Sequence, residues 1–193
     1  MGSVLVIGGG AAGLAAAIAA AECGDTVTVA EKMDRVGKKI LATGNGRCNL
    51  MNTGAPRYPG NAAFAADVLS HCGAEAQKAF WEHLGLRLRQ EEAGRVYPVS
   101  SQASSVLDAL RLQLTALHVR VVTGVSITAL HRENDGWTAL SADGQQFRAN
   151  RVIISGGGCA QPKLGSDGSA LRLLTNLGCP PTPFAPPLTQ IIT

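Results

Sequence analysis

Residues 4–31 read VLVIGGGAAGLAAAIAAAECGDTVTVAE. The apolar run at 4–7 predicts a buried strand, and the alanine-rich run that ends at Glu22 predicts a helix packed closely on that strand. Residues 27–30 predict a second strand, parallel to the first. Together these three segments predict the first βαβ unit of a Rossmann-type α/β fold.

Three glycines between the first strand and the helix each have a mechanical reason. Gly8 permits the tight turn, Gly10 lets a pyrophosphate approach the backbone, and Gly13 allows close packing of helix and strand. The start of the helix offers free N–H groups and a partial positive charge to phosphates. Glu31 ends the second strand, where a carboxylate can bind a ribose and repel a 2′-phosphate. A glycine-rich turn in an unrelated α/β protein is the alternative, but the spacing of strand, helix and acid favours a dinucleotide site.

Composition limits the class of protein. The chain has 193 residues, of which 46% are hydrophobic and 16% charged, as expected for a globular chain with a sizeable core. The formal net charge of +3 is too small to argue for a nucleic-acid partner. The sequence contains no apolar run long enough to span a bilayer. The five cysteines are scattered, without a C-x-x-C pair or metal-ligand spacing, so we expect no metal site and a cytoplasmic location.

The segment after Glu31 predicts a long loop rich in glycine and cations, without a clear period. A loop of that length inside a compact domain is usually functional. A solvated basic loop is the alternative, because loops collect charge in any case. The positive charges are Arg35, Lys38, Lys39 and Arg47.

The rest of the chain predicts helices followed by a β-meander. Phe64 and Val68 lie at helical spacing, and the serines at 100 and 101 are good caps for a crossover helix that leads into a parallel strand. Clusters of Asn, Asp and Gly predict hairpin turns, and a triple glycine follows the last strand. We expect helices at 61–71, 74–84, 100–117 and 167–177, and strands at 86–89, 95–98, 119–122, 125–130, 136–140, 146–149 and 151–155.

This order of elements resembles the FAD-binding fold of the glutathione-reductase type. Four local motifs are more specific: EK at 31–32, GKKIL at 37–41, TGNGRCN at 43–49, and GG at 157–158 followed by PKLG at 162–165. They resemble the BaiN/YhiN-like bacterial flavoproteins, a family of NAD(P)/FAD-dependent oxidoreductases that includes the aminoacetone oxidase family. The similarity covers the whole chain. Members are about twice this length, so the resemblance implies an N-terminal fragment.

The resemblance also implies a set of FAD-binding residues. The diphosphate would meet Gly8, Gly10, Ala11, Ala12 and Gly13, and the ribose would meet Glu31. Lys32 and Lys39 would lie along the cofactor, and Gly46, Arg47 and Cys48 would lie beside the flavin. The backbone of Val125 would hold the adenine, and Gly157 and Gly158 would pass close to the cofactor. We therefore expect Glu31 and Gly157 to share one groove. Cys48 has no neighbouring cysteine for a dithiol mechanism, and a structural role is favoured over a single-thiol role. No catalytic residue is assigned.

The expected fold is therefore an α/β Rossmann-like parallel sheet with a β-meander and a helical insertion. The expected function is hydride transfer between a nicotinamide and a small organic substrate through FAD, with no nucleic acid or membrane partner. An FAD-dependent RNA-modifying protein and a plain NAD-binding module are the alternatives. The expected divisions are the βαβ unit at 1–32, the insertion at 33–101, the crossover at 102–124, the meander at 125–149, a strand, glycines and helix at 150–178, and the start of a second domain at 179–193.

Overall fold

The fold is given by a computed structural model, which describes residues 1–54, 58 and 60–182. A four-stranded parallel sheet lies at its centre, in the order β10-β1-β2-β6. Its strands are β1 (Ser3–Ile7), β2 (Thr26–Glu31), β6 (Arg120–Thr123) and β10 (Arg151–Ile154). The predicted βαβ unit is confirmed, since α1 (Ala11–Glu22) connects β1 to the parallel strand β2.

The two faces of the parallel sheet are covered by different elements. Val4 and Val6 of β1 pack with α1 and α5 (Ala103–Ala116), whereas Leu5 and Ile7 pack on the other face. There they contact the antiparallel meander and α6 (Ser169–Asn176). Successive side chains of a strand point to opposite faces of the sheet, and both faces are covered here, so the strand needs a continuous apolar run. The predicted meander consists of β7 (Ile127–Glu133), β8 (Gly136–Ser141) and β9 (Gln146–Ala149).

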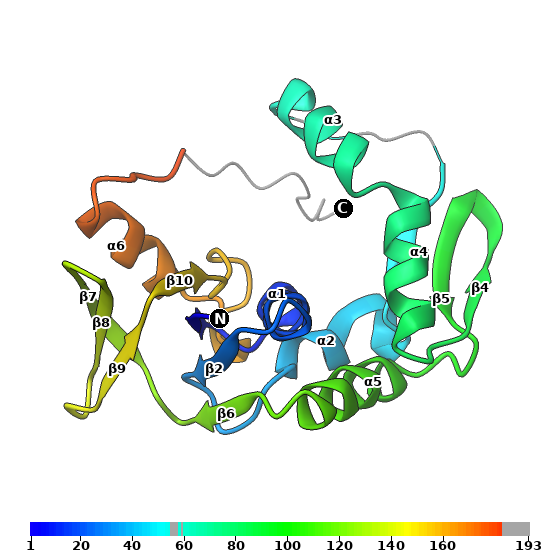
Figure 1. The fold of residues 1–193 in the computed structure, drawn as a ribbon. Helices are drawn as coiled ribbons and strands as arrows, with labels where there is room; N and C mark the ends of the chain where they lie inside the picture. Colours follow the sequence, from blue (N-terminus) through cyan, green and yellow to red (C-terminus); the bar gives the residue numbers. More distant parts are fainter. Residues whose placement is uncertain (55–57, 59, 183–193) are drawn as a thin grey trace.

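Most of the insertion between β2 and α5 lies on the side of the parallel sheet away from the meander, beyond α1 and α2 (Figure 1). Its small antiparallel sheet has the order β3-β5-β4. Phe80 and Trp81 pack edge to face with ring centroids 5.1 Å apart, at the margin of the main core. The elements of the insertion are α2 (Lys38–Ala42), η1 (Thr43–Gly46), β3 (Met51–Asn52), α3 (Ala62–His71), α4 (Ala74–His83), β4 (Leu88–Gln90), η2 (Glu92–Gly94) and β5 (Arg95–Pro98).

Two local predictions are wrong. The segment after Glu31 is not a plain loop, because Gly37 adopts the left-handed conformation (φ 74°) that starts the short helix α2. The serines at 100 and 101 do not cap α5. Ser101 has φ 53° and donates its N–H to the Pro98 carbonyl, so the chain is still turning there. The helix begins after Gln102, without a side-chain cap.

The last expected division lies mostly outside the described residues. The structure describes the chain only as far as residue 182, after the short helix η3 (Pro162–Leu164) and α6. The proposed start of a second domain at 179–193 therefore stays a prediction. Within the described part of the chain, no helix has both the length and the apolar character needed to cross a bilayer.

Candidate functional site

The glycine turn between β1 and α1 is constrained at two positions and open at a third. A Cβ atom on Gly13 would lie 1.9 Å from the Gly8 carbonyl oxygen, and one on Gly8, where φ is +109°, would lie 2.8 Å from Gly156. By contrast, a Cβ atom on Gly10 would meet no protein atom within 4 Å. The turn is thus closed on the side of the sheet and open on the side where a ligand would approach.

The first turn of α1 faces this open space. Gly10 is the N-cap residue, without a capping side-chain hydrogen bond, and the first turn contains no acidic side chain. The N–H groups at the start of α1 are therefore free to bind an anion. A groove of about 270 Å³ adjoins the turn. It is lined by Gly8, Gly9, Gly10, Ala11, Ala12, Glu31, Met33, Arg35, Gly37, Lys38, Lys39, Ser155, Gly156, Gly157, Leu164, Gly165 and Ser166.

Glu31 lies at the edge of the groove, as the sequence predicts, and is only 8% exposed. One carboxylate oxygen accepts the Gly9 N–H at 2.5 Å and the other accepts the Met33 N–H at 2.7 Å. A carboxylate offers about four lone-pair positions, so acceptor capacity remains for further hydroxyl donors. The two backbone contacts fix the carboxylate in place before any ligand arrives.

The second glycine cluster closes the groove from the other side. Gly157 lines the same groove as Glu31, as expected. Lys39 donates from its ammonium to the Ser166 hydroxyl at 2.6 Å, which ties α2 to the loop after β10. This contact joins residues 127 positions apart and holds a cation beside the groove.

A second, smaller hollow continues from the glycine turn toward the meander. Lys32 and Val125 both line it, together with Glu31, Ser169 and Ala170. The Val125 N–H donates to the Glu31 carbonyl at 2.9 Å, so this N–H is already used. The structure therefore brings Gly8, Gly10, Ala11, Ala12, Gly13, Glu31, Lys32, Lys39, Val125 and Gly157 into one continuous region.

The remaining predicted residues lie beyond the two hollows as the described residues define them. Gly46 and Arg47 follow α2, and Arg47 contacts another part of the insertion: its guanidinium lies 2.5 Å from Glu91 and stacks over Tyr97 at 4.1 Å. Gly158 contacts the start of α6, since its carbonyl accepts the Gly168 N–H at 3.1 Å. Glu91 forms an ion pair with Arg47, so the guanidinium charge is balanced within the chain.

Cys48 is buried within the main core, next to the loop of η1. Burial raises the pKa of its thiol, opposed by a hydrogen bond with Thr43. A raised pKa leaves less thiolate at neutral pH, and the thiolate is the reactive form. These facts agree with the favoured structural role for this cysteine.

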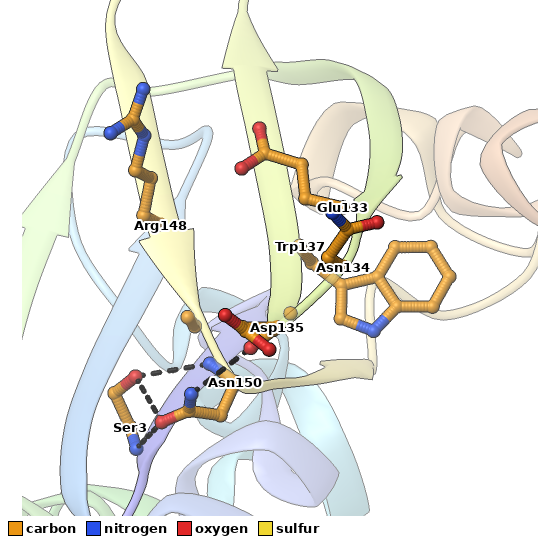
Figure 2. A pocket seen from close by; sticks show the side chains of 9 residues that line it. Ser3, Glu133, Asn134, Asp135, Trp137, Arg148 and Asn150 are labelled. Carbon is orange, nitrogen blue, oxygen red and sulfur yellow. Dashed lines mark hydrogen bonds between the residues drawn. The ribbon is translucent and has the colours of Figure 1, made fainter.

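Another hollow lies at the amino end of β1, opposite the glycine turn (Figure 2). It measures about 600 Å³ and includes Ser3, the first residue of β1, whereas the glycine turn follows the last. Asn150 accepts the Ser3 N–H at 2.8 Å and donates to the Asp135 carbonyl at 3.2 Å. Parallel sheets bind ligands at their carboxyl ends. We therefore infer that these polar groups have a structural role, in which they join the meander to β1.

Several groove residues were not anticipated from the sequence. Ser155 and Gly156 lie in the triple-glycine segment, and that cluster was the available signal for them. Ser166 and Ser169 carry no such signal, because their roles depend on contacts with Lys39 and Lys32 across the fold.

These features define a dinucleotide-binding domain of the Rossmann type, with its ligand groove at the carboxyl ends of β1 and β2. A family model described as "HI0933-like protein Rossmann domain" matches residues 2–184. The chain belongs to this HI0933-like family, which confirms the resemblance inferred from the local motifs.

Curated relatives cover nearly the whole chain. A 3-dehydro-bile acid delta(4,6)-reductase of Clostridium scindens is 44% identical over 99% of this chain and 47% of its own length. A ribosomal RNA dihydrouridine synthase of Haemophilus influenzae is 25% identical over 93% of this chain and 46% of its own. The chain thus spans about half the length of these relatives.

Solved structures with low sequence identity share the fold. A flavocytochrome c3 fumarate reductase in an open conformation superposes with a TM-score of 0.66 at 17% identity, covering 91% of this chain and 40% of that one. A 3-ketosteroid-delta4-(5alpha)-dehydrogenase from Rhodococcus jostii gives 0.62 at 16% identity, with coverages of 92% and 54%. The predicted fold class is confirmed by the family match and these superpositions.

Proposed function

We propose that the whole protein is an FAD-dependent oxidoreductase and that this chain supplies the groove for the ADP half of the cofactor. One observation carries the proposal: the uncapped start of α1 opens onto free space above Gly10, with the Glu31 carboxylate held at the edge of that space. A diphosphate and a ribose are the chemical groups that fit these two features. FAD supplies the redox chemistry when bound.

The residues of the chain have distinct roles in this proposal. The N–H groups of Ala11 and Ala12 would bind the diphosphate, and the Lys39 ammonium would add a positive charge beside it. Glu31 would accept the ribose hydroxyls with its remaining lone pairs. The carbonyl of Val125 is left for the adenine, because its N–H is already donated to Glu31. Gly46, Arg47 and Cys48 stay proposals for the flavin end, and Gly158 stays a proposal for a close approach to the cofactor.

The substrate and the electron donor belong to the proposal as well. We propose a small organic substrate and a nicotinamide as the source of hydride. The relative that is 44% identical is named for a 3-dehydro bile acid, so that compound class is the first to assay. The assay follows NADH or NADPH oxidation by the whole protein in the presence of the compound.

An RNA-modifying flavoprotein is the second candidate function. It is favoured by the two relatives named ribosomal RNA dihydrouridine synthase, at 25% and 23% identity. A net charge of +3 gives little support for a broad RNA-binding face. A gel shift with ribosomal RNA fragments separates the two candidates, because an oxidoreductase of small molecules predicts no shift.

A plain NAD-binding module is the remaining alternative, and it predicts a colourless protein that binds NADH but not FAD.

Gly10→Val tests the cofactor groove directly. The residue has extended backbone angles (φ −82°, ψ −174°) and open surroundings, so valine should fit without disturbing the fold. Its branched side chain would fill the space assigned to the diphosphate. We expect FAD affinity of the whole protein to fall at least about tenfold, the loss that one or two charge-assisted hydrogen bonds produce.

The control for this experiment is Ala19→Val, which adds the same group to an exposed position of α1. Flavin absorbance and fluorescence measure cofactor content, and circular dichroism checks the fold. A Gly10→Val protein that stays folded and binds FAD like the wild type would refute the assignment of the groove.

A further inference from the structure

Lys32, which lines the smaller hollow, forms an ion pair with Asp167. The Lys32 ammonium donates to an Asp167 carboxylate oxygen at 2.5 Å and to the Ser169 hydroxyl at 3.0 Å. The same carboxylate oxygen accepts the Ser169 N–H at 3.0 Å. These contacts hold the pKa of the Asp167 carboxyl well below its usual range, with the Lys32 hydrogen bond as the largest cause.

The pair lies close to where the proposed function puts the ribose of the cofactor. Lys32 directly follows Glu31, and both residues line the hollow together with Ser169 at the start of α6. In Figure 1, α6 lies beside β10 and the meander, on the same side of the sheet as this hollow. Any group attached to the ribose there would meet the Lys32 ammonium or the first turn of α6.

An ammonium next to the acid that ends the second strand has a chemical consequence. In dinucleotide sites an acid at that position selects a free 2′-hydroxyl, whereas a neighbouring cation accommodates a 2′-phosphate. Taken alone, Glu31 would therefore favour a free 2′-hydroxyl and Lys32 would favour a 2′-phosphate. Asp167 removes the conflict, because its carboxylate balances the charge of the Lys32 ammonium and accepts hydrogen bonds from it and from the Ser169 N–H, which an incoming phosphate would need.

We propose that Asp167 is a specificity-determining residue, which acts as an internal anion on Lys32 and so excludes nucleotides with a 2′-phosphate from the cofactor groove. The inference rests on the proposed function, since it needs an ADP group in that groove. Its consequence in the cell is that the 2′-phosphorylated nicotinamide pool cannot compete with FAD for the site. Glu31 and Asp167 together oppose the phosphate, and Lys32 serves to hold the loop before α6.

The experiment compares two probes that differ only in the 2′-phosphate: AMP and adenosine 2′,5′-bisphosphate. Their dissociation constants are measured by calorimetry on the whole protein after removal of its cofactor. Asp167→Asn keeps an oxygen for the Ser169 N–H but removes the charge. We expect the preference for AMP over the bisphosphate to fall roughly fivefold or more, as one partly exposed charge contact would produce. The matched control is Asp67→Asn, which removes the same charge from an exposed site on α3.

A second variant identifies the cation. In Lys32→Gln combined with Asp167→Asn, the gain for the bisphosphate should disappear, because the freed ammonium is no longer present. If Asp167→Asn leaves the ratio unchanged while the wild type binds AMP, the inference is wrong and the proposed function stands. If the wild type binds neither probe, both are overturned. An equal gain in the Asp67→Asn control would also refute it, since net charge alone would then explain the change.

Discussion

Four helices of this chain form two groups that differ in burial. α1 buries Gly13, Leu14, Ala17 and Ile18, and α5 buries five residues. α3 and α4, each of ten residues, bury none. Phe64 of α3 is 66% exposed even though it lies at helical spacing with Val68.

This difference shows what an amphipathic pattern can and cannot specify. Most of the stability of a helix in a protein comes from packing its apolar face, and the pattern identifies that face but not the surface that covers it. α1 is covered by the parallel sheet, and two strands of that sheet, β1 and β2, flank the helix in sequence. For α3 no covering surface is present among the described residues. Mutations in the two groups should therefore have very different costs.

Gly13→Ala should give the largest effect. The new Cβ atom would lie 1.9 Å from a backbone oxygen of Gly8, and neither chain segment can move without separating α1 from the sheet. We expect a loss of roughly 4 kcal/mol or more in the free energy of unfolding, at the upper end for overpacking and backbone strain. Urea denaturation followed by circular dichroism measures it.

The control is Gly10→Ala in the same turn, where the added methyl group meets no protein atom within 4 Å. Its free energy of unfolding should stay within about 0.5 kcal/mol of the wild type, as for ordinary surface changes. Equal losses in both variants would contradict the close contact of α1 with the turn.

The stability losses of two variants, Leu110→Ala and Phe64→Ala, compare the two groups of helices directly. Leu110 of α5 is fully buried, so its truncation should cost about 3 kcal/mol. Phe64 is exposed, so losing its larger ring should cost less than about 0.5 kcal/mol. Leu112→Ala, at a 71% exposed position of α5, controls for the loss of a leucine from that helix. A cost above about 1 kcal/mol for Phe64→Ala would mean that α3 is packed after all.

The same distinction decides how much of the molecule could be predicted from its sequence. The βαβ unit and the position of Glu31 at the groove depend on residues within one short stretch, where turn geometry and spacing are enough. The contact of Lys39 with Ser166 joins residues 127 apart, and that of Arg47 with Glu91 joins residues 44 apart. Such pairs depend on how the insertion and the loop after β10 fold back, which no local pattern encodes.

The smallest effect should come from Arg47 and Glu91, a pair within the insertion that joins the segment after η1 to the segment before η2. Both Arg47 and Arg89 donate to one Glu91 oxygen, at 2.5 and 2.8 Å, and the Arg47 hydrogen bond is the largest cause that lowers the pKa of Glu91. A carboxyl whose pKa is lower in the folded state stabilises the fold above its unfolded value of about 4.5. That contribution is lost as the pH falls through the pKa of the folded state.

Glu91→Gln should therefore lower stability slightly at pH 7 and remove part of the decline in stability between about pH 5 and pH 3, measured by urea denaturation across that range. If the stability of the variant and of the wild type declines in parallel, Glu91 does not stabilise the contact between these two segments of the insertion.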